Sequence, residues 1–388
     1  MNLRLPLLIT LSVCAVPSIL PAGPGPFPDK SPVPAARASG WRFSAGFMHR
    51  SLGDFDWSAG THSVPSLLTI GQGSNTPGIE AIGPADMFFN RTYLDGFNFQ
   101  DGGTAVGGDT WNWGYQNASQ VSGDMISFHG GNGTSATLTD SDHYESGDWT
   151  GGLDGNAPFF QLEWLHPLTA SLNFGFQGNV SFLDTGTART LGTFTANKGR
   201  TDYSILYTDR YSLGEVIVPQ APYTGGPQGP GPLIPNLPTD RTPASTVSGG
   251  ETATAFNSIH TDFNLNLAAI SLGPVMEYAR GKFALQASAG LTINIAQWEV
   301  DQRETLFVSR NGAPATAQNS WQDHDSDTRV LPGLFLQTAL SRQLNERWSL
   351  NLSGRYDWVH TIHLDAGPSF GSANLSGWSV GAGVGFRF

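Results

Sequence analysis

Apolar and polar residues alternate in several segments of this chain. In the segment 170–182, ASLNFGFQGNVSF, apolar side chains occupy one face and Ser, Asn and Gln occupy the other. The segments 283–295, 348–358 and 378–388 repeat this pattern. Because successive side chains of a strand point to opposite faces, the alternation predicts amphipathic β-strands.

The two faces of these strands differ in size as well as in polarity. The apolar face carries bulky Leu, Ile, Phe and Trp, whereas the polar face carries mainly Gly, Ser, Asn and Gln with occasional charges. A soluble sandwich usually presents Lys, Glu and Thr on its polar face. Small polar residues instead fit the crowded interior of a narrow barrel whose outside meets lipid. We therefore favour a membrane barrel over a soluble sandwich.

Aromatic residues recur at matched positions on the apolar face. Trp348 and Trp358 are ten residues apart, as are Trp378 and Phe388. Ten residues span about 33 Å along a strand, which the strand tilt reduces to about 25 Å, the height of the apolar band of an outer-membrane barrel. The predicted aromatic girdle comprises Trp348, Trp358, Trp378, Phe386 and Phe388.

Short and long connections alternate along the chain. Tight junctions fall at 166–169, 279–282 and 345–347. Long Gly-, Pro- and Asp-rich intervals fall at about 51–157, 185–256 and 301–327, with a shorter one at 364–373. Outer-membrane barrels have short periplasmic turns and long extracellular loops, so the alternation predicts this orientation.

The predicted fold is all-β, a closed antiparallel up-and-down transmembrane β-barrel spanning residues 40–388. Eight strands are expected, with both termini on the periplasmic side: 40–50, 158–166, 169–184, 257–279, 283–300, 328–343, 347–362 and 374–388. The long intervals contain further strand-like pieces, so we expect either hairpins that project far above the membrane or a barrel of ten to twelve strands. The Pro-rich segment 219–250 is not expected to form a central strand, because proline cannot donate to the ladder.

Composition narrows the class of protein further. Of 388 residues only 13% are charged and 11% are aromatic, with 48 Gly and 25 Pro. This aromatic content excludes a disordered chain, and the absence of any apolar run of about 20 residues excludes a helical membrane protein. A net charge of -12 without a basic cluster argues against nucleic-acid binding.

The N-terminus has the features of a secretory signal. Residues 1–22 combine a basic start, an apolar stretch and small residues, and cleavage as late as residue 38 fits equally well. A Pro-rich linker is expected over 23–39. Cys14 falls within the signal, so the mature chain is expected to have no cysteine. Export without a membrane helix leaves a secreted protein or an outer-membrane barrel, and the strand pattern favours the barrel.

The signal peptide, the dyad strands and the ending WSVGAGVGFRF resemble the bacterial outer-membrane β-barrel superfamily. The chain is most similar in pattern to small barrels such as the transmembrane domain of outer membrane protein A, although its outer loops are much longer. The resemblance implies location in the bacterial outer membrane, with the lipid bilayer as a partner. The terminal Phe388 resembles the signal that the barrel-assembly machinery recognises.

Charged residues on the polar faces would point into the barrel. By strand parity the expected lumen network comprises Glu163, Arg329, Arg355, Asp357 and Arg387. Charges in a narrow barrel must be paired and hydrogen-bonded to be tolerated. Such a network either fills the lumen or forms an ion-selective constriction, and eight strands favour the filled lumen.

Catalytic and metal-binding candidates are sparse. The candidates are histidines with polar residues near them in the sequence: His129, His143, His324, His360 and His363, with Ser127, Ser141, Asp140, Asp142 and Asp357. They lie in no catalytic motif of the family, so we expect no enzymatic activity and no cofactor. Alternating carboxylates are a weak candidate for a cation site, and an acidic solvated loop is the simpler interpretation: Asp323, Asp325 and Asp327.

The predicted role is structural or surface-interactive, with a filled lumen and the long acidic loops as the contact surface for an unidentified ligand. A porin-like channel for small solutes is the first alternative. An outer-membrane lipid hydrolase is the second, because some barrels of the superfamily hydrolyse lipid acyl chains.

Overall fold

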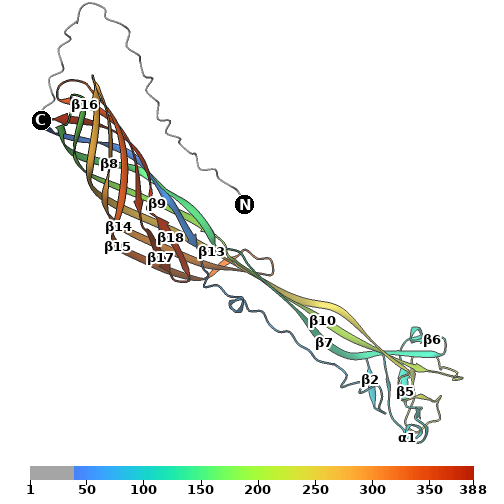
Figure 1. Cartoon of the computed structure of the whole chain (residues 1–388). Coiled ribbons are helices and arrows are strands. Elements are labelled where there is room, and N and C mark those ends of the chain that lie inside the picture. Colours follow the sequence, from blue (N-terminus) through green and yellow to red (C-terminus); the bar gives the residue numbers. More distant parts are fainter. Residues whose placement is uncertain (1–38) are drawn as a thin grey trace, which may run out of the picture.

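The computed structural model describes residues 39–388. The expected signal peptide 1–22 and nearly all of the expected linker 23–39 lie outside the described residues. The described chain is built mostly from β-strands, and none of its helices is long and apolar enough to cross a membrane. Three parts follow one another in space, a barrel, a stalk and a head, from upper left to lower right in Figure 1.

The barrel is a closed ring of eight antiparallel strands. Each strand pairs with the next and the last pairs with the first, so hydrogen bonds run around the ring. This agrees with the eight strands expected from the sequence. In ring order the strands are β1 (Gly40–Ser58), β8 (Asp148–Pro167), β9 (Leu172–Leu191), β13 (Asp240–Arg280), β14 (Phe283–Arg310), β15 (Thr316–Gln343), β16 (Trp348–Val359) and β19 (Gly377–Arg387).

The first described residues, the C-terminus and the short turns share one end of the barrel. Arg42 near the start of β1 pairs with Arg387 on β19 and with Glu163 on β8. The turns that join β8 to β9, β13 to β14 and β15 to β16 lie at this same end, as the alternation of connections predicts. At the other end, β17 (Thr361–Ala366) and β18 (Ser369–Asn374) form a hairpin whose second strand continues the wall beside β1.

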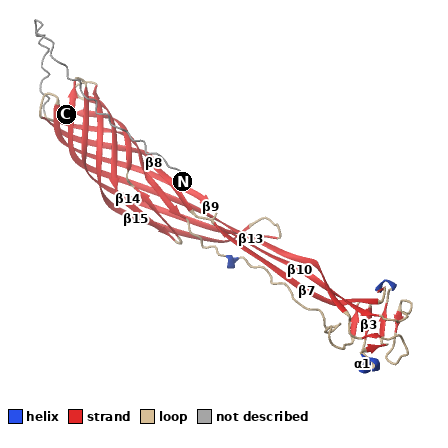
Figure 2. Cartoon of the chain, turned by 45° about the vertical axis from the view of Figure 1, so that its right-hand side comes forward, coloured by secondary structure: helices blue, strands red, loops and turns tan. Residues whose placement is uncertain are grey.

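The stalk is a three-stranded antiparallel ribbon that continues from the barrel (Figure 2). It consists of β7 (Met125–Tyr144), β10 (Phe194–Ser212) and the first part of β13, which pairs with β10 from residue 240 to residue 256. The long outer intervals therefore contain projecting strands, the first of the two expected arrangements. Pro243 lies at the edge of this ribbon, where only one side of the strand is paired.

The barrel strands extend further than expected at their outer ends. β1, β8, β9, β14 and β15 all continue into intervals that were assigned to loops, so the boundaries at 51–157, 185–256 and 301–327 are wrong in detail. β13 alone runs for 41 residues and belongs to both the barrel and the stalk. The sequence does not identify these outer ends because their alternation is reversed: apolar side chains such as Phe55, Trp57 and Trp149 face the interior, whereas the outward positions are polar.

The head is a small mixed unit at the far end of the stalk. Its apolar core is formed by Tyr93, Trp113, Phe128, Tyr211 and Ile234, among others. Asp101 caps a short α-helix of the head through its side chain. The elements of the head and of the adjoining connections are β2 (Arg91–Tyr93), β3 (Gly96–Asn98), α1 (Gly102–Gly107), β4 (Asp109–Thr110), β5 (Trp113–Tyr115), β6 (Val121–Ser122), β11 (Tyr223–Thr224), β12 (Ile234–Pro235) and the 3-10 turns η1 (Pro65–Leu67) and η2 (Ala118–Gln120).

Candidate functional site

The half of the barrel interior nearer the short turns holds a buried charge network. Glu163 on β8 accepts hydrogen bonds from Arg42, at 2.7 Å from its Nε, and from Gln286 at 3.2 Å. Glu277 on β13 lies 3.1 Å from the Arg42 guanidinium and accepts a 2.8 Å hydrogen bond from Asn173. One arginine thus ties two carboxylates from different strands across the barrel.

A second cluster lies further along the interior. The Arg355 guanidinium donates to Asp357 at 2.6 Å and to the Ser271 hydroxyl at 2.8 Å. It also lies 4.4 Å from the centre of the Phe335 ring. Arg50, only 2% exposed, approaches the same carboxylate at 3.7 Å. Two buried cations therefore share one buried anion, which makes Asp357 central to this cluster.

The outer half of the interior is apolar. Five large aromatic side chains, none more than 6% exposed, anchor a continuous hydrophobic cluster: Phe55, Trp57, Trp149, Phe263 and Trp298. Together with the two charge clusters, this packing occupies the interior positions from the periplasmic end to the base of the stalk. Buried side chains therefore line the described barrel interior along its length.

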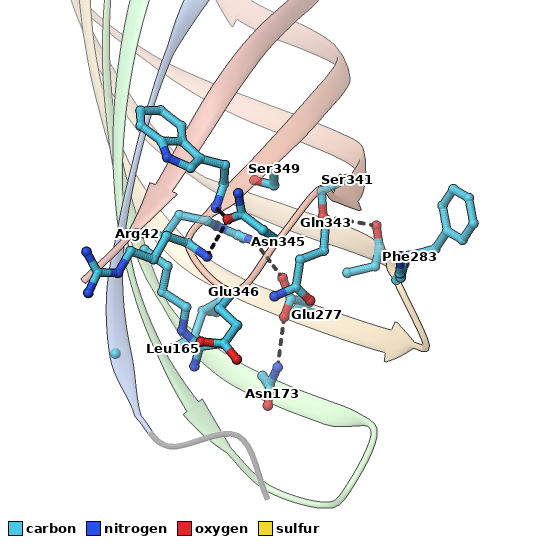
Figure 3. A pocket seen from close by; sticks show the side chains of 16 residues that line it. Arg42, Leu165, Asn173, Glu277, Phe283, Ser341, Gln343, Asn345, Glu346 and Ser349 are labelled. Carbon is cyan, nitrogen blue, oxygen red and sulfur yellow. Dashed lines mark hydrogen bonds and ion pairs between the residues drawn. The ribbon is translucent and has the colours of Figure 1, made fainter. Parts of the chain in front are cut away.

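A small cavity lies at the periplasmic mouth (Figure 3). Arg42, Asn173 and Glu277 border it from the barrel side, and Gln343 and Arg387 also line it. Its volume of 50 Å³ has room for only a few waters. The cavity therefore adjoins the charge network and is too small for a solute of ordinary size.

Four of the five expected lumen residues lie at interior or mouth positions. Glu163, Arg355 and Asp357 are buried in the two clusters, and Arg387 lines the mouth cavity. Arg329 was placed in the network wrongly. Its side chain is 52% exposed, pairs with Asp327 at 3.0 Å and stacks 5.4 Å from the Trp298 ring. The reason is that β15 has already lost its pairing with β16 at this height, so the inner face is open to solvent.

Three interior charges were missed, Arg42, Arg50 and Glu277. Each is on the inward-facing set of its strand, so strand parity would have identified them. Their partners come from other strands, and those pairings depend on the register of the barrel.

The five girdle aromatics all lie on the outer face. Trp348, Trp358, Trp378 and Phe388 are each 45% exposed or more. Trp348 pairs with Phe386 near the periplasmic turns. Trp358 and Trp378 lie toward the other end of the same two strands. These aromatic side chains lie at the two borders of the apolar outer surface of the barrel.

The proposed cation ligands do not assemble. Asp323 contacts His62 at 3.1 Å, and Asp325 accepts a backbone hydrogen bond from Asp365 at 3.4 Å. Asp327 binds Arg329, as described above. Alternate residues on a strand are about 6.6 Å apart, too far for three carboxylates to share one ion without rearrangement. In the described structure each of the three carboxylates has its own protein partner.

A buried carboxylate at the outer mouth was not foreseen. Glu304 on β14 accepts hydrogen bonds from the His62 amide at 2.6 Å, the Ser63 hydroxyl at 2.8 Å and the Asn257 amide at 2.7 Å, and also from Thr61. Burial alone would raise the pKa of Glu304, but these donors lower it overall. The cluster holds the connecting segment after β1 against the top of the barrel.

The junction of head and stalk contains a second buried carboxylate. Asp209 on β10 forms a two-pronged ion pair with Arg241 at 2.6 Å and accepts a hydrogen bond from the Tyr93 hydroxyl of the head. Arg241 also donates to the Gly83 carbonyl of the head at 2.7 Å. Burial is the main cause that raises the pKa of Tyr93, which keeps this hydroxyl a donor. These contacts fix the head on the stalk.

The histidine candidates are spread over the whole molecule. His129 pairs with Asp95 in the head at 2.7 Å, and His143 lies 3.7 Å from Glu145 on the stalk. His324 is on the barrel wall, and His360 and His363 are near the β17 hairpin. None of them contacts the serines first considered, Ser127 and Ser141, among the described hydrogen bonds.

The ring and its surface define a class of protein. A closed ring leaves no unpaired edge, and its outer face carries exposed Phe176, Leu291 and Leu352 while its inner face is polar or packed. Such a surface is stable only in lipid, and closed barrels are the strand structures that satisfy every backbone group there. The chain is therefore an outer-membrane β-barrel protein carrying a large external extension.

Comparisons with known proteins give structural likeness only. No protein-family model and no curated protein sequence matches the chain. The outer membrane protein OprG from Pseudomonas aeruginosa is 8% identical over 90% of this chain and 96% of its own, with a TM-score of 0.31.

Two further matches are also bacterial outer-membrane barrels. An outer membrane channel from Pseudomonas putida F1 is 7% identical over 93% of this chain and 100% of its own, with a TM-score of 0.20. A FadL homologue from P. aeruginosa is 8% identical over 89% of this chain and 90% of its own, with a TM-score of 0.18. The closed ring and its apolar outer surface define the class of this protein.

Proposed function

We propose that the barrel is a membrane anchor that displays the head on the cell surface as an interaction module. The observation that carries this proposal is the stalk, which continues from the end of the barrel opposite the periplasmic turns (Figures 1 and 2). A three-stranded ribbon of this length has no role in closing the ring. Its contacts with the head through Asp209 and Arg241 favour a fixed rather than a loosely tethered head.

The filled interior supports an anchor over a channel. Eight strands give an interior just wide enough for side chains, and the charge clusters and aromatic core occupy it. An anchor needs only stability in lipid, which a packed interior provides.

The charge of the head favours a cationic partner. Residues 77–124 and 213–239 contain seven carboxylates and one basic side chain, Arg91. Arg91 is fully buried and donates to backbone carbonyls, so its charge is not presented to a partner. A surface of this composition attracts basic ligands and repels anionic ones, and the attraction weakens with salt.

Cysteine labelling tests the display. Cys14, in the expected signal peptide, is the chain's single cysteine, so one introduced thiol can be followed. Gln228→Cys in the exposed head loop should react with a membrane-impermeant maleimide on intact cells. Lys282→Cys in a periplasmic turn is the matched control and should react only after the outer membrane is permeabilised. The reverse pattern would contradict the proposed orientation.

Binding of whole cells to polylysine-coated beads tests the charge. The variant E80Q/D86N/E215Q removes three exposed carboxylates of the head and should weaken binding at low salt. Glu145→Gln at the base of the stalk, 69% exposed, is the control and should have a smaller effect. Equal binding by both variants and the unchanged protein would refute the proposed role of the head.

A further inference from the structure

His324 on β15 links a hydroxyl to a carboxylate on the outer wall of the barrel. Its Nδ1 lies 3.0 Å from Oδ1 of Asp301, and its Nε2 lies 3.3 Å from Oγ of Ser326. In the part of the chain that the structure describes, no other histidine bonds both a serine and a carboxylate. A Ser–His–Asp chain of this order is the arrangement that activates a serine nucleophile.

The fold brings these three side chains together for simple reasons. Ser326 and His324 are two residues apart on one strand, so both project from the same face. Asp301 is the direct cross-strand partner of His324 on β14. Glu299 pairs with Ser326 in the same way, and its carboxylate lies 3.9 Å from Nδ1 of His324.

The group lies just beyond the lipid-facing surface. The outward apolar series on β14 ends at Ile295, and the corresponding series on β15 ends at Val330. Ser326 is four residues beyond Val330, toward the stalk. At about 3.3 Å per residue and the usual strand tilt, the serine lies on the order of 10 Å above the apolar belt, where lipid head groups meet water. The ester linkages of membrane lipids lie just below that level.

A shallow groove adjoins the serine. Its volume is 190 Å³, and Ser326, His324 and Glu299 line it together with three amide side chains, Asn264, Asn266 and Gln297. Amide N–H groups are donors of the kind that stabilise the oxyanion formed when a nucleophile attacks an ester carbonyl. Nucleophile, base, positioning carboxylate and candidate oxyanion donors thus share one face of the barrel.

We propose that Ser326, His324 and Asp301 form the active site of a lipid acyl-ester hydrolase at the outer leaflet. The Ser326 oxygen attacks the ester carbonyl carbon while its proton passes to Nε2 of His324. The bond to the lipid alcohol then breaks, and His324 returns that proton to the leaving oxygen. Water, deprotonated by the same nitrogen, attacks the acyl-serine and releases a fatty acid with regeneration of Ser326. Asp301 acts on His324 alone, as a positioning residue.

The shared substrate chemistry is an ester-linked acyl chain, and two lipid classes of an outer membrane carry it. The purified full-length protein is therefore given glycerophospholipid vesicles in one arm and lipopolysaccharide in the other, and released fatty acid is measured. Release in the first arm alone assigns a phospholipase, and release in the second alone assigns a deacylase of the glycolipid. Release in neither arm overturns the proposal.

Variants separate catalysis from folding. Ser326→Ala and His324→Ala should each lower release by about a thousandfold or more. Ser320→Ala, an exposed serine on the same face of β15 without a histidine contact, is the matched control and should retain full activity. Heat-modifiable gel migration reports whether each variant still forms a barrel. Activity retained in Ser326→Ala would refute the assignment of the nucleophile.

Two further readouts test the roles directly. A fluorophosphonate probe should label the unchanged protein at Ser326, identified by mass spectrometry of the modified peptide. Labelling should be lost in His324→Ala, because the hydroxyl is then no longer activated. Asp301→Asn should lower kcat with little change in KM and alter the pH profile, which a purely structural role would not do. Labelling at Ser320 instead of Ser326 would contradict the proposal.

Discussion

Each charged side chain inside the barrel is tolerated because it is paired with a side chain of opposite charge. Asp357 is 2% exposed and is the shared partner of Arg355 and Arg50. Removing one member of a buried pair lowers the folding stability by more than the pair itself contributes to it, because the remaining charge is left without water and without a partner. The same logic applies to Arg42 between Glu163 and Glu277.

Asp357→Asn should therefore destabilise the barrel strongly. Two buried guanidinium groups would face a neutral amide, and the expected loss is about 3–5 kcal/mol. Urea unfolding of the detergent-solubilised protein, followed by gel mobility, measures it. Asp154→Asn on β8, where the side chain is exposed, is the control and should change stability by no more than about 0.5 kcal/mol. Similar losses in both variants would argue against the paired cluster.

The Glu304 cluster should respond to acid. Its carboxylate has a pKa lowered below the ordinary 4.5, so the stabilisation is complete above that value and is lost as pH falls through the lower, folded-state pKa. Amide hydrogen exchange at His62 and Ser63 should therefore accelerate on acidification below about pH 4.5, after correction for the intrinsic rate. In Glu304→Gln the amide exchange should already be fast at neutral pH, and the corrected exchange rate should no longer depend on pH in this range. Unchanged protection in the variant would show that Glu304 does not hold the segment.

Strand parity predicts which side chains face inward but not which of them meet. Glu163 and Asp357 were identified because their strands have a clear period-two pattern. His324 was noted as a candidate, but its partner Asp301 is 23 residues away on another strand. Cross-strand contacts of this kind depend on register, which turn and packing geometry determine together.

Among the elements, the stalk strands were the hardest to predict. β7 ends in TSATLTDSDHY, which is polar on both faces because the ribbon is solvated on both sides. Without a buried face, neither the period-two signal nor the register is specified by hydrophobicity. The barrel strands were predictable because lipid on one side and a packed interior on the other impose opposite demands on alternate residues.

The head should unfold locally without the barrel. Asp101 accepts hydrogen bonds from the first turn of α1 and from Thr110, Trp111 and Asn112, and these donors lower its pKa although burial opposes them. Asp101→Ala should destabilise this element by about 1–2 kcal/mol. Limited proteolysis should then cleave within 99–112 more readily, while the gel mobility of the folded barrel stays unchanged. If the protease resistance of 99–112 and the gel mobility of the folded barrel are lost together, the head and the barrel fold as one unit.

The whole molecule consists of an eight-stranded barrel, a stalk and a head. In the described barrel the interior is charged and hydrogen-bonded near the short turns and aromatic toward the stalk. We propose that the acidic head faces a partner and that Ser326, His324 and Asp301 act on the outer wall. Both proposed activities lie outside the lumen, and the role proposed for the lumen is stability.

Single-channel recording in planar lipid bilayers tests this central claim most directly. The purified, folded protein should insert and give no stable conductance steps, because side chains from both halves fill the interior. Insertion is verified independently by proteolytic protection of the barrel in the same membranes. Stable, reproducible open steps from the unchanged protein would contradict the packed lumen and would favour a pore.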